Sequence, residues 1–123
     1  MVAREFYGKA LKINPNCAEA YRGLGEIARV QAEEMSIYST MSDAQVFGMA
    51  MLGGGTINRS ELKKAVEQAN SEAVVFYNKA IELDPENAEL YYSRANFFES
   101  REMYNFAIED YGKILALDEK DFY

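Results

Sequence analysis

The sequence predicts an all-α protein built from stacked helical hairpins, and two observations support this prediction. First, the stretch FYGKALKINPNCAEAY at residues 6–21 returns as FYNKAIELDPENAELY at residues 76–91, and a weaker copy, DYGKILALDEKDFY, begins at Asp110. Second, the apolar residues of these copies recur every three or four positions, which is the spacing of one face of a helix. The interval from Phe6 to Phe76 is much longer than the interval from Phe76 to Asp110, so the repeat is irregular.

Composition limits the class of protein. At 123 residues with 49% hydrophobic content, the chain is long enough for one domain with a core. The net charge is −7, and the 13 basic residues are scattered among 20 acidic ones. This disfavours binding to nucleic-acid phosphates and to anionic membranes, both of which attract clustered Lys and Arg. A single cysteine excludes an intrachain disulfide, and no leader or spanning apolar run is present. We therefore expect a soluble cytoplasmic protein with neither nucleic-acid nor membrane partners.

The last third of the chain predicts one complete hairpin. Residues 88–121 contain two segments with apolar residues at helical spacing, and the break between them lies near residues 100–103. Ala95 and Ala107 are small enough to let two antiparallel helices cross closely. The space beside them is expected to be filled by Tyr104 and Tyr111. Such a unit cannot bury its apolar face alone, so it must stack on a neighbour.

These residues resemble the tetratricopeptide repeat, a helical hairpin of about 34 residues. The first-helix signature is matched by Tyr21, Leu24, Gly25 and Ala28. The second-helix signature, Ala followed four residues later by an aromatic residue, is matched by the pairs Ala3 and Tyr7, Ala73 and Tyr77, and Ala107 and Tyr111. Pro15 and Pro85 match the proline that closes a repeat. The departures are Ala95 for glycine, Ile114 for a small residue and Glu119 for the third proline. The resemblance covers residues 1–31 and 71–121.

The long interval from Phe6 to Phe76 indicates an insertion, because it exceeds one repeat of about 34 residues by about 36 residues. A hidden extra repeat would run its first helix through Gly53, Gly54 and Gly55, and each glycine disfavours a helix interior by about 1 kcal/mol. The insertion is therefore predicted at a hairpin turn. The expected organisation is one domain: residues 1–17 as the second helix of a partial repeat, 18–87 as a repeat with an insertion at 34–70, and 88–121 as a third repeat.

Local signals predict how the insertion folds. The helix that starts at Ala18 is expected to continue towards Met35 and to weaken over residues 36–42. Capping boxes are predicted at Ser42 with Gln45 and at Asn58 with Glu61, the second flanked by a hydrophobic staple of Ile57 and Leu62. The first box would start a short helix that ends at the triple glycine. From Arg59 a helix is expected to reach Leu83, so the middle repeat becomes an elongated hairpin.

Motifs for catalysis or metal binding are missing from the sequence. The chain has no histidine, and its single cysteine, Cys17, is interpreted as a bystander thiol. Residues 55–62, GTINRSEL, resemble the end of a calcium-binding loop, but the positions of the preceding oxygen ligands hold Ala50, Leu52 and Gly54. The adjacent acidic pairs are expected to be solvated: Glu33 with Glu34, and Glu109 with Asp110. We predict no enzyme activity, no metal and no cofactor.

Two surfaces are candidates for binding a protein or peptide. The resemblance implies that the first helix of each repeat lines a concave groove. The residues predicted there are Arg22, Glu26, Arg29, Tyr92, Asn96 and Glu99. Ordinary solvated charge is the favoured interpretation of the two arginines taken alone, and the carboxylate clamp of some family members is not matched, because Glu26 and Ser93 replace its asparagines. The second surface is the insertion, with Met35, Met41, Met49 and Met51, whose alternative role is packing between the two arms.

Two functions follow from these surfaces. The first is a protein–protein interaction module of tetratricopeptide type, and the alternative is a structural segment of a larger solenoid without a ligand of its own. Residues 1–13 present the face of Ala3, Tyr7 and Ala10 with no preceding first helix to cover it, and the last repeat poses the same problem around Ile114, Leu117 and Phe122. A homodimer formed through these uncapped ends or through the insertion would bury such faces.

Overall fold

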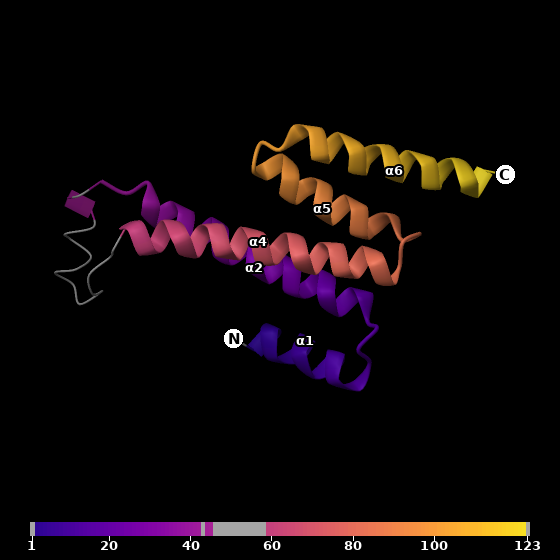
Figure 1. Cartoon of the computed structure of the whole chain (residues 1–123), viewed down its shortest axis with the longest axis horizontal. Coiled ribbons are helices and arrows are strands. Elements are labelled where there is room, and N and C mark those ends of the chain that lie inside the picture. The colour runs from indigo at the N-terminus through magenta and orange to yellow at the C-terminus, as the bar shows by residue number, and fades with distance from the viewer. Residues whose placement is uncertain (1, 43, 46–58, 123) are drawn as a thin grey trace.

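In a computed structural model that describes residues 2–42, 44–45 and 59–122, the protein is a row of α-helices (Figure 1). The helices are α1 (Val2–Ile13), α2 (Ala18–Ser39), α4 (Arg59–Leu83), α5 (Ala88–Ser100) and α6 (Tyr104–Phe122). No strand occurs in these described ranges. The prediction of an all-α helical repeat is therefore confirmed.

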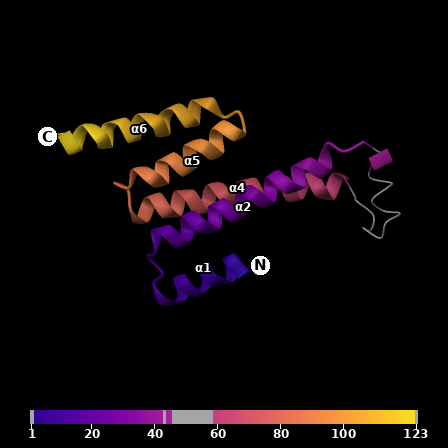
Figure 2. The same ribbon diagram turned by 180° about the vertical axis from the view of Figure 1, so that it is seen from behind.

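The helices form successive antiparallel neighbours. The longest pair, α2 and α4, makes the most extensive interhelical packing, with α1 against α2 on one side and the α5–α6 hairpin on the other. The view from behind shows α2 in front of α4, and it shows that α2 and α5 run in the same direction (Figure 2). Because α2 also contacts α5, these two helices form one face of the row.

Short proline-containing turns separate the hairpins. Pro15 follows α1 and Pro85 follows α4, in each case where a proline cannot continue the helix. The side chain of Asn87 then caps α5 by accepting a hydrogen bond from the backbone N–H of Glu89 at 3.1 Å. Cys17 holds the equivalent position before α2 in the preceding repeat, and it provides no side-chain cap.

Small residues allow α2 and α4 to pack closely. Gly25 faces the ring of Tyr77, and a Cβ atom added to Gly25 would lie 2.9 Å from that ring. Ala28 and Ala73 are buried in the same cluster. The remaining members of this cluster are Tyr77, Phe97, Phe98 and Ala107. Ala28, Ala73, Tyr77 and Ala107 are tetratricopeptide-like positions identified in the sequence, whereas Phe97 is a core residue that the repeat signature does not include.

The α5–α6 hairpin confirms one packing prediction and corrects another. Ala95 and Ala107 are buried, as expected for a close crossing, and Tyr111 packs against the core. Tyr104, in contrast, is exposed, so the expectation that it fills space beside the alanines is wrong. It is the first residue of α6, and 55% of it is exposed.

A buried ion pair joins α5 to α6. The guanidinium of Arg94 donates to both carboxylate oxygens of Asp110, at 2.6 and 2.9 Å, and to Asn78 Oδ1 of α4 at 2.8 Å. Only 2% of the Asp110 side chain is exposed, while its neighbour Glu109 lies on the surface. The expectation that both acids are solvated is therefore wrong for Asp110, because its partner comes from another helix.

The arms of the middle hairpin are partly as predicted. Helix α2 ends at Ser39, within residues 36–42 where it was expected to weaken, and α4 runs from Arg59 to Leu83 as predicted. The capping box at Ser42 is confirmed: its N–H donates to Gln45 Oε1 at 2.9 Å, and the N–H of Gln45 donates to Ser42 Oγ at 3.2 Å. The predictions for residues 46–58, including the triple glycine, the staple residue Ile57, the cap Asn58, Met49 and Met51, lie outside the described residues.

Candidate interaction surface

The six residues predicted to contact a partner lie on α2 and α5. Arg22, Glu26 and Arg29 are on α2, and Tyr92, Asn96 and Glu99 are on α5. Each member of the first set aligns with a member of the second when the two copies of the repeat are superposed, so the sets occupy equivalent places in successive repeats. We refer to them together as the α2–α5 face.

Glu26 and Arg29 form hydrogen bonds with other residues of the chain. Arg29 donates to Glu26 Oε2 at 2.8 Å and to Glu33 Oε1 at 3.2 Å. The hydroxyl of buried Tyr77 donates to the other oxygen of Glu26 at 2.9 Å. Burial raises the pKa of Tyr77, and the negative charge of Glu26 raises it further. Glu26 therefore connects the surface of α2 to the core.

Arg101, which the sequence analysis did not single out, extends this network to α5. It donates to Asn70 Oδ1 at 2.9 Å and to Glu33 Oε1 at 3.3 Å, and its guanidinium lies 4.9 Å from the centre of the Phe97 ring. Glu33 thus accepts hydrogen bonds from two arginines, while 41% of its side chain stays exposed, so the expected solvation is accompanied by ion pairs that were not predicted. The position of Arg101 just after α5 gives no sequence signal for contacts to α2 and α4.

The α5 residues of the face surround an aromatic pair. Tyr92 is 55% exposed, and its ring meets that of Tyr111 edge to face with 6.4 Å between the centres. The hydroxyl of Tyr111 donates to Glu99 at 2.9 Å, and this hydrogen bond raises the pKa of Tyr111. Asn96 accepts a longer hydrogen bond from the same hydroxyl at 3.4 Å.

Arg22 is held less firmly than Arg29. Its ion pair is with Glu19, three residues earlier on α2, at 2.7 Å, and about a third of its side chain is exposed. Desolvation lowers the pKa of Arg22, but Glu19 and the nearby carboxylate of Glu89 on α5 outweigh this and raise it. An exposed pair of this kind contributes only about 0–1 kcal/mol, so a partner's carboxylate can compete for the guanidinium.

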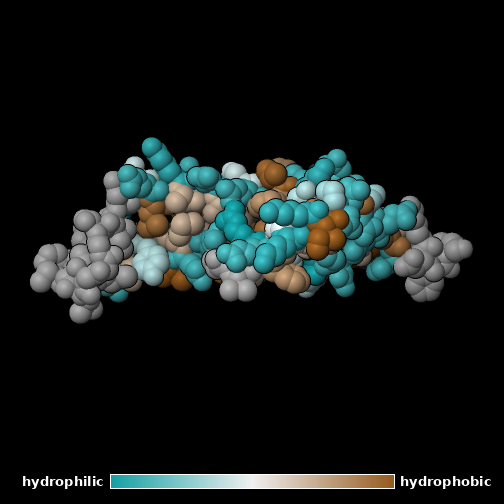
Figure 3. Space-filling model, turned by 90° about the horizontal axis from the view of Figure 1, so that it is seen from below, coloured by the Kyte–Doolittle hydropathy of each residue, from teal (hydrophilic) through white to brown (hydrophobic). Residues whose placement is uncertain are grey.

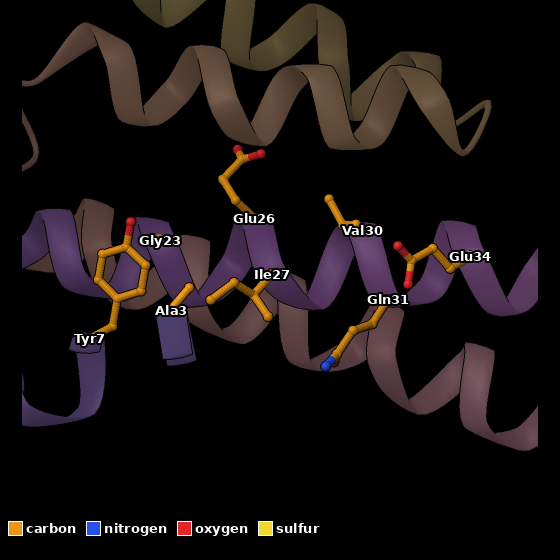
Figure 4. A pocket seen from close by; sticks show the side chains of 8 residues that line it. All are labelled: Ala3, Tyr7, Gly23, Glu26, Ile27, Val30, Gln31 and Glu34. Carbon is orange, nitrogen blue, oxygen red and sulfur yellow. The ribbon is translucent and has the colours of Figure 1, made fainter. Parts of the chain in front are cut away.

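A pocket of about 280 Å³ lies where α2 meets α1, and it shares Glu26 with the α2–α5 face (Figure 4). The residues that line it are Ala3, Tyr7, Gly23, Glu26, Ile27, Val30, Gln31 and Glu34. Figure 4 shows that the first two come from α1 and the rest from α2. The sequence predicts that Ala3 and Tyr7 lie on one face of a helix, but it does not predict this pocket.

The surface around α1 contains apolar residues in separate patches. Figure 3, which views the molecule from the side on which α1 lies, shows these patches surrounded by hydrophilic residues. Phe6, on α1, is 67% exposed.

In the described part of the chain there is no group of three or more Cys, Asp, Glu or His residues that could hold a metal ion. The helices of that part include no candidate for a membrane span.

Comparison with known proteins supports an assignment to a repeat family. Residues 61–101 match the family model described as TPR repeat, the tetratricopeptide repeat. This segment covers most of α4, all of α5 and the first residue of the following turn. No curated protein matches the chain. Such repeats serve generally as protein–protein interaction modules. The matched repeat, the order of the helices and the glycine and alanine contacts between them agree with a helical repeat of tetratricopeptide type, and the family match itself covers residues 61–101.

Proposed function

We propose that this protein is a non-enzymatic interaction module that binds a peptide or partner protein through the α2–α5 face. The observation that carries the proposal is the exposure of Tyr92, a large aromatic side chain, at the position equivalent to Arg22 on the neighbouring helix. Tyrosine and arginine are enriched among the residues that dominate binding energy. The expected partner segment is extended and acidic where it meets Arg22 and apolar where it meets Tyr92.

The roles of the six residues differ in this proposal. Arg22 and Tyr92 contact the partner directly, while Asn96 and Glu99 offer further polar groups beside Tyr92. Glu26 and Arg29 act mainly as positioning residues, because their hydrogen bonds lead to Tyr77 and Glu33. The interaction would take place in the cytoplasm, without a cofactor and without nucleic acid.

The test is a pull-down with the isolated chain, followed by titration of each recovered partner. Arg22→Glu and Tyr92→Ala should each weaken a genuine partner by about tenfold or more, and the effect of Arg22→Glu should be larger at low salt. Val75→Ala is the matched control, because Val75 is an exposed apolar residue of α4 outside the face.

Different outcomes of the same experiment point elsewhere. If a partner ignores both substitutions but requires the methionines of the insertion, the binding site lies in that segment, whose Met35 and Met41 are half-buried. If no partner is recovered, the alternative of a structural segment within a larger solenoid is favoured.

A homodimer is also proposed, and its most suitable surface is the exposed apolar stripe of α6, formed by Tyr104, Ile108 and Leu115.

A further inference from the structure

A cavity of about 390 Å³ lies between α4, α5 and α6, and Figure 1 shows α5 between the other two helices. Its least exposed residues form the base: Arg94, Phe98 and Asp110. The exposed residues of its rim are Asn78, Met103, Phe106 and Glu109. All of its lining residues fall within residues 74–110, so the cavity is formed by one continuous part of the chain and needs no neighbouring repeat.

The base of this cavity departs from the repeat. When the copies are superposed, the ion-paired Arg94 and Asp110 occupy the positions that hold Leu24 and Phe76 in the middle repeat. Leu24 is buried, and Phe76 is half-buried with its ring 6.5 Å from that of Tyr21. The repeat can therefore be built with apolar residues at both places, and a buried ion pair stabilises a fold no better than such residues do. A role at the cavity explains the ion pair better than stability does.

The ion pair also holds a polar group at the rim. Arg94 donates to Asn78 Oδ1 at 2.8 Å, and Asn78 itself is exposed. Because its oxygen accepts from Arg94, the Asn78 amide keeps its two N–H groups for a bound segment, where a backbone carbonyl is a suitable acceptor.

Apolar side chains line the part of the cavity next to the turn between α5 and α6. The ring of buried Phe98 lies 5.3 Å from that of Phe106, measured between their centres. Phe106 is 50% exposed and Met103 is 39% exposed, so this cluster is open to solvent on one side. A flexible methionine beside aromatic rings can adapt to an inserted apolar side chain.

The lining of the cavity has a net negative charge. Glu109 is exposed about one helical turn after Phe106, and the charge of Asp110 is balanced by Arg94. Two carboxylates against one guanidinium leave one negative charge, which lies at the rim on Glu109. The charge that complements this rim is positive.

We propose that this cavity binds an extended segment of a partner protein that carries a large apolar residue and, two positions away, a lysine or arginine. The apolar side chain would enter between Phe98, Phe106 and Met103, and the basic side chain would pair with Glu109. Phe106 and Glu109 are separated by about 5 Å along α6, and side chains two positions apart on an extended segment share one face at about 6.6 Å, so the spacings agree. The segment is basic, whereas the one expected at the α2–α5 face is acidic near Arg22.

The probe is the peptide acetyl-GKSFSKG-amide, in which lysines on both sides of the phenylalanine allow either chain direction. It is titrated into the isotope-labelled intact chain, and the amide chemical shifts are followed by nuclear magnetic resonance. Saturable changes are expected within residues 74–78, 94–98 and 106–110, with a Kd of about 1 mM. The matched peptides acetyl-GKSASKG-amide and acetyl-GESFSEG-amide should each bind at least about fivefold more weakly, since one lacks the apolar side chain and the other the positive charge.

Variants of the chain test the two contacts. Phe106→Ala should weaken binding by about fivefold or more. Tyr104→Ala is the matched control, because it removes a ring of similar exposure that lies on the opposite side of α6. Glu109→Lys should weaken binding of the lysine peptide and strengthen binding of the glutamate peptide, and Asp118→Lys, at another exposed acid of α6, should not produce this reversal.

A further variant separates a role in binding from a role in folding. Arg94→Leu/Asp110→Phe gives the third hairpin the residues of the middle repeat at both positions. It should fold, as circular dichroism can verify, because an apolar pair replaces the whole ion pair. It should lose the peptide, because Asn78 is no longer held and the larger side chain at position 110 fills part of the cavity. A folded double variant that binds like the wild type would overturn the role of the ion pair.

Other outcomes overturn the site itself. These are the absence of saturable shift changes, equal effects of Phe106→Ala and Tyr104→Ala, and shift changes centred on Arg22 and Tyr92. Self-association of the chain that is abolished by Phe106→Ala would make a second copy the occupant and would also overturn the proposal. Arg22→Glu and Tyr92→Ala should leave the affinity for this peptide unchanged, so the function proposed for the α2–α5 face is tested separately.

Discussion

At the scale of single residues, glycines play two different roles in this chain. A Cβ atom at Gly25 would lie 2.9 Å from the ring of Tyr77, a residue of α4 that is only 1% exposed. A Cβ atom at Gly112, in the middle of α6, would meet nothing within 4 Å. The same substitution should therefore have opposite effects at the two positions.

We predict that Gly25→Ala destabilises the protein by about 1–3 kcal/mol, the usual effect of overpacking a core. Gly112→Ala should instead stabilise it by about 0.5–1 kcal/mol, because alanine loses less backbone entropy in a helix. Urea unfolding followed by circular dichroism measures both free energies of unfolding. Equal effects of the two substitutions would show that the Gly25–Tyr77 contact does not restrict the distance between α2 and α4.

At the scale of helices, the features that could be predicted from the sequence are those that depend on local signals. The ends of α4 at Arg59 and Leu83, the break near residues 100–103 and the capping box at Ser42 each depend on residues close together in the chain. The repeat spacing also located the core alanines, because each copy confirms the others. The end of α2 at Ser39 lies within residues 36–42, the polar stretch that predicts a weakening of the helix.

Contacts between distant side chains could not be predicted in this way. Asp110 looked like its exposed neighbour Glu109, and only the packing of α5 on α6 brings it to Arg94, 16 residues away in the sequence. Glu33 meets Arg101 across 68 residues. In the candidate site, the faces of α2 and α5 could be predicted from the helical period. The hydrogen bonds that join Glu26 to Tyr77 and Arg29 to Glu33 could not.

The Arg94–Asp110 ion pair is predicted to stabilise the packing of α5 on α6. It connects α5 and α6, and through Asn78 it also reaches α4. Removing one partner of a buried pair leaves an uncompensated charge, so Asp110→Ala should lower the free energy of unfolding by about 3–5 kcal/mol. Glu109→Ala, at the exposed neighbouring position, should change it by no more than about 0.5 kcal/mol. Chemical denaturation of both variants makes the comparison, and similar small effects would mean that the pair does not hold the hairpin together.

At the scale of the whole molecule, the two sides of the row present different open surfaces. The α1 side has an exposed Phe6 and the pocket between α1 and α2. The other side exposes Tyr104, Ile108 and Leu115 of α6, which lie on one face because they are spaced by four and seven residues. Two copies of this stripe can meet about a two-fold axis.

We therefore predict that the protein self-associates through α6. A two-fold contact would place the Ile108 and Leu115 side chains of both copies together, and each is about two-thirds exposed in the single chain. Burial of each such side chain contributes about 1.5–3 kcal/mol, but association also costs entropy, so the dimer should be weak and dependent on concentration. Light scattering on a size-exclusion column should show the mass rising above 13.9 kDa as the concentration increases. The double variant Ile108→Glu/Leu115→Glu should remain monomeric, whereas Val75→Glu, which places a charge at another exposed apolar position, should still dimerise. A wild-type mass of 13.9 kDa at every concentration would refute the prediction.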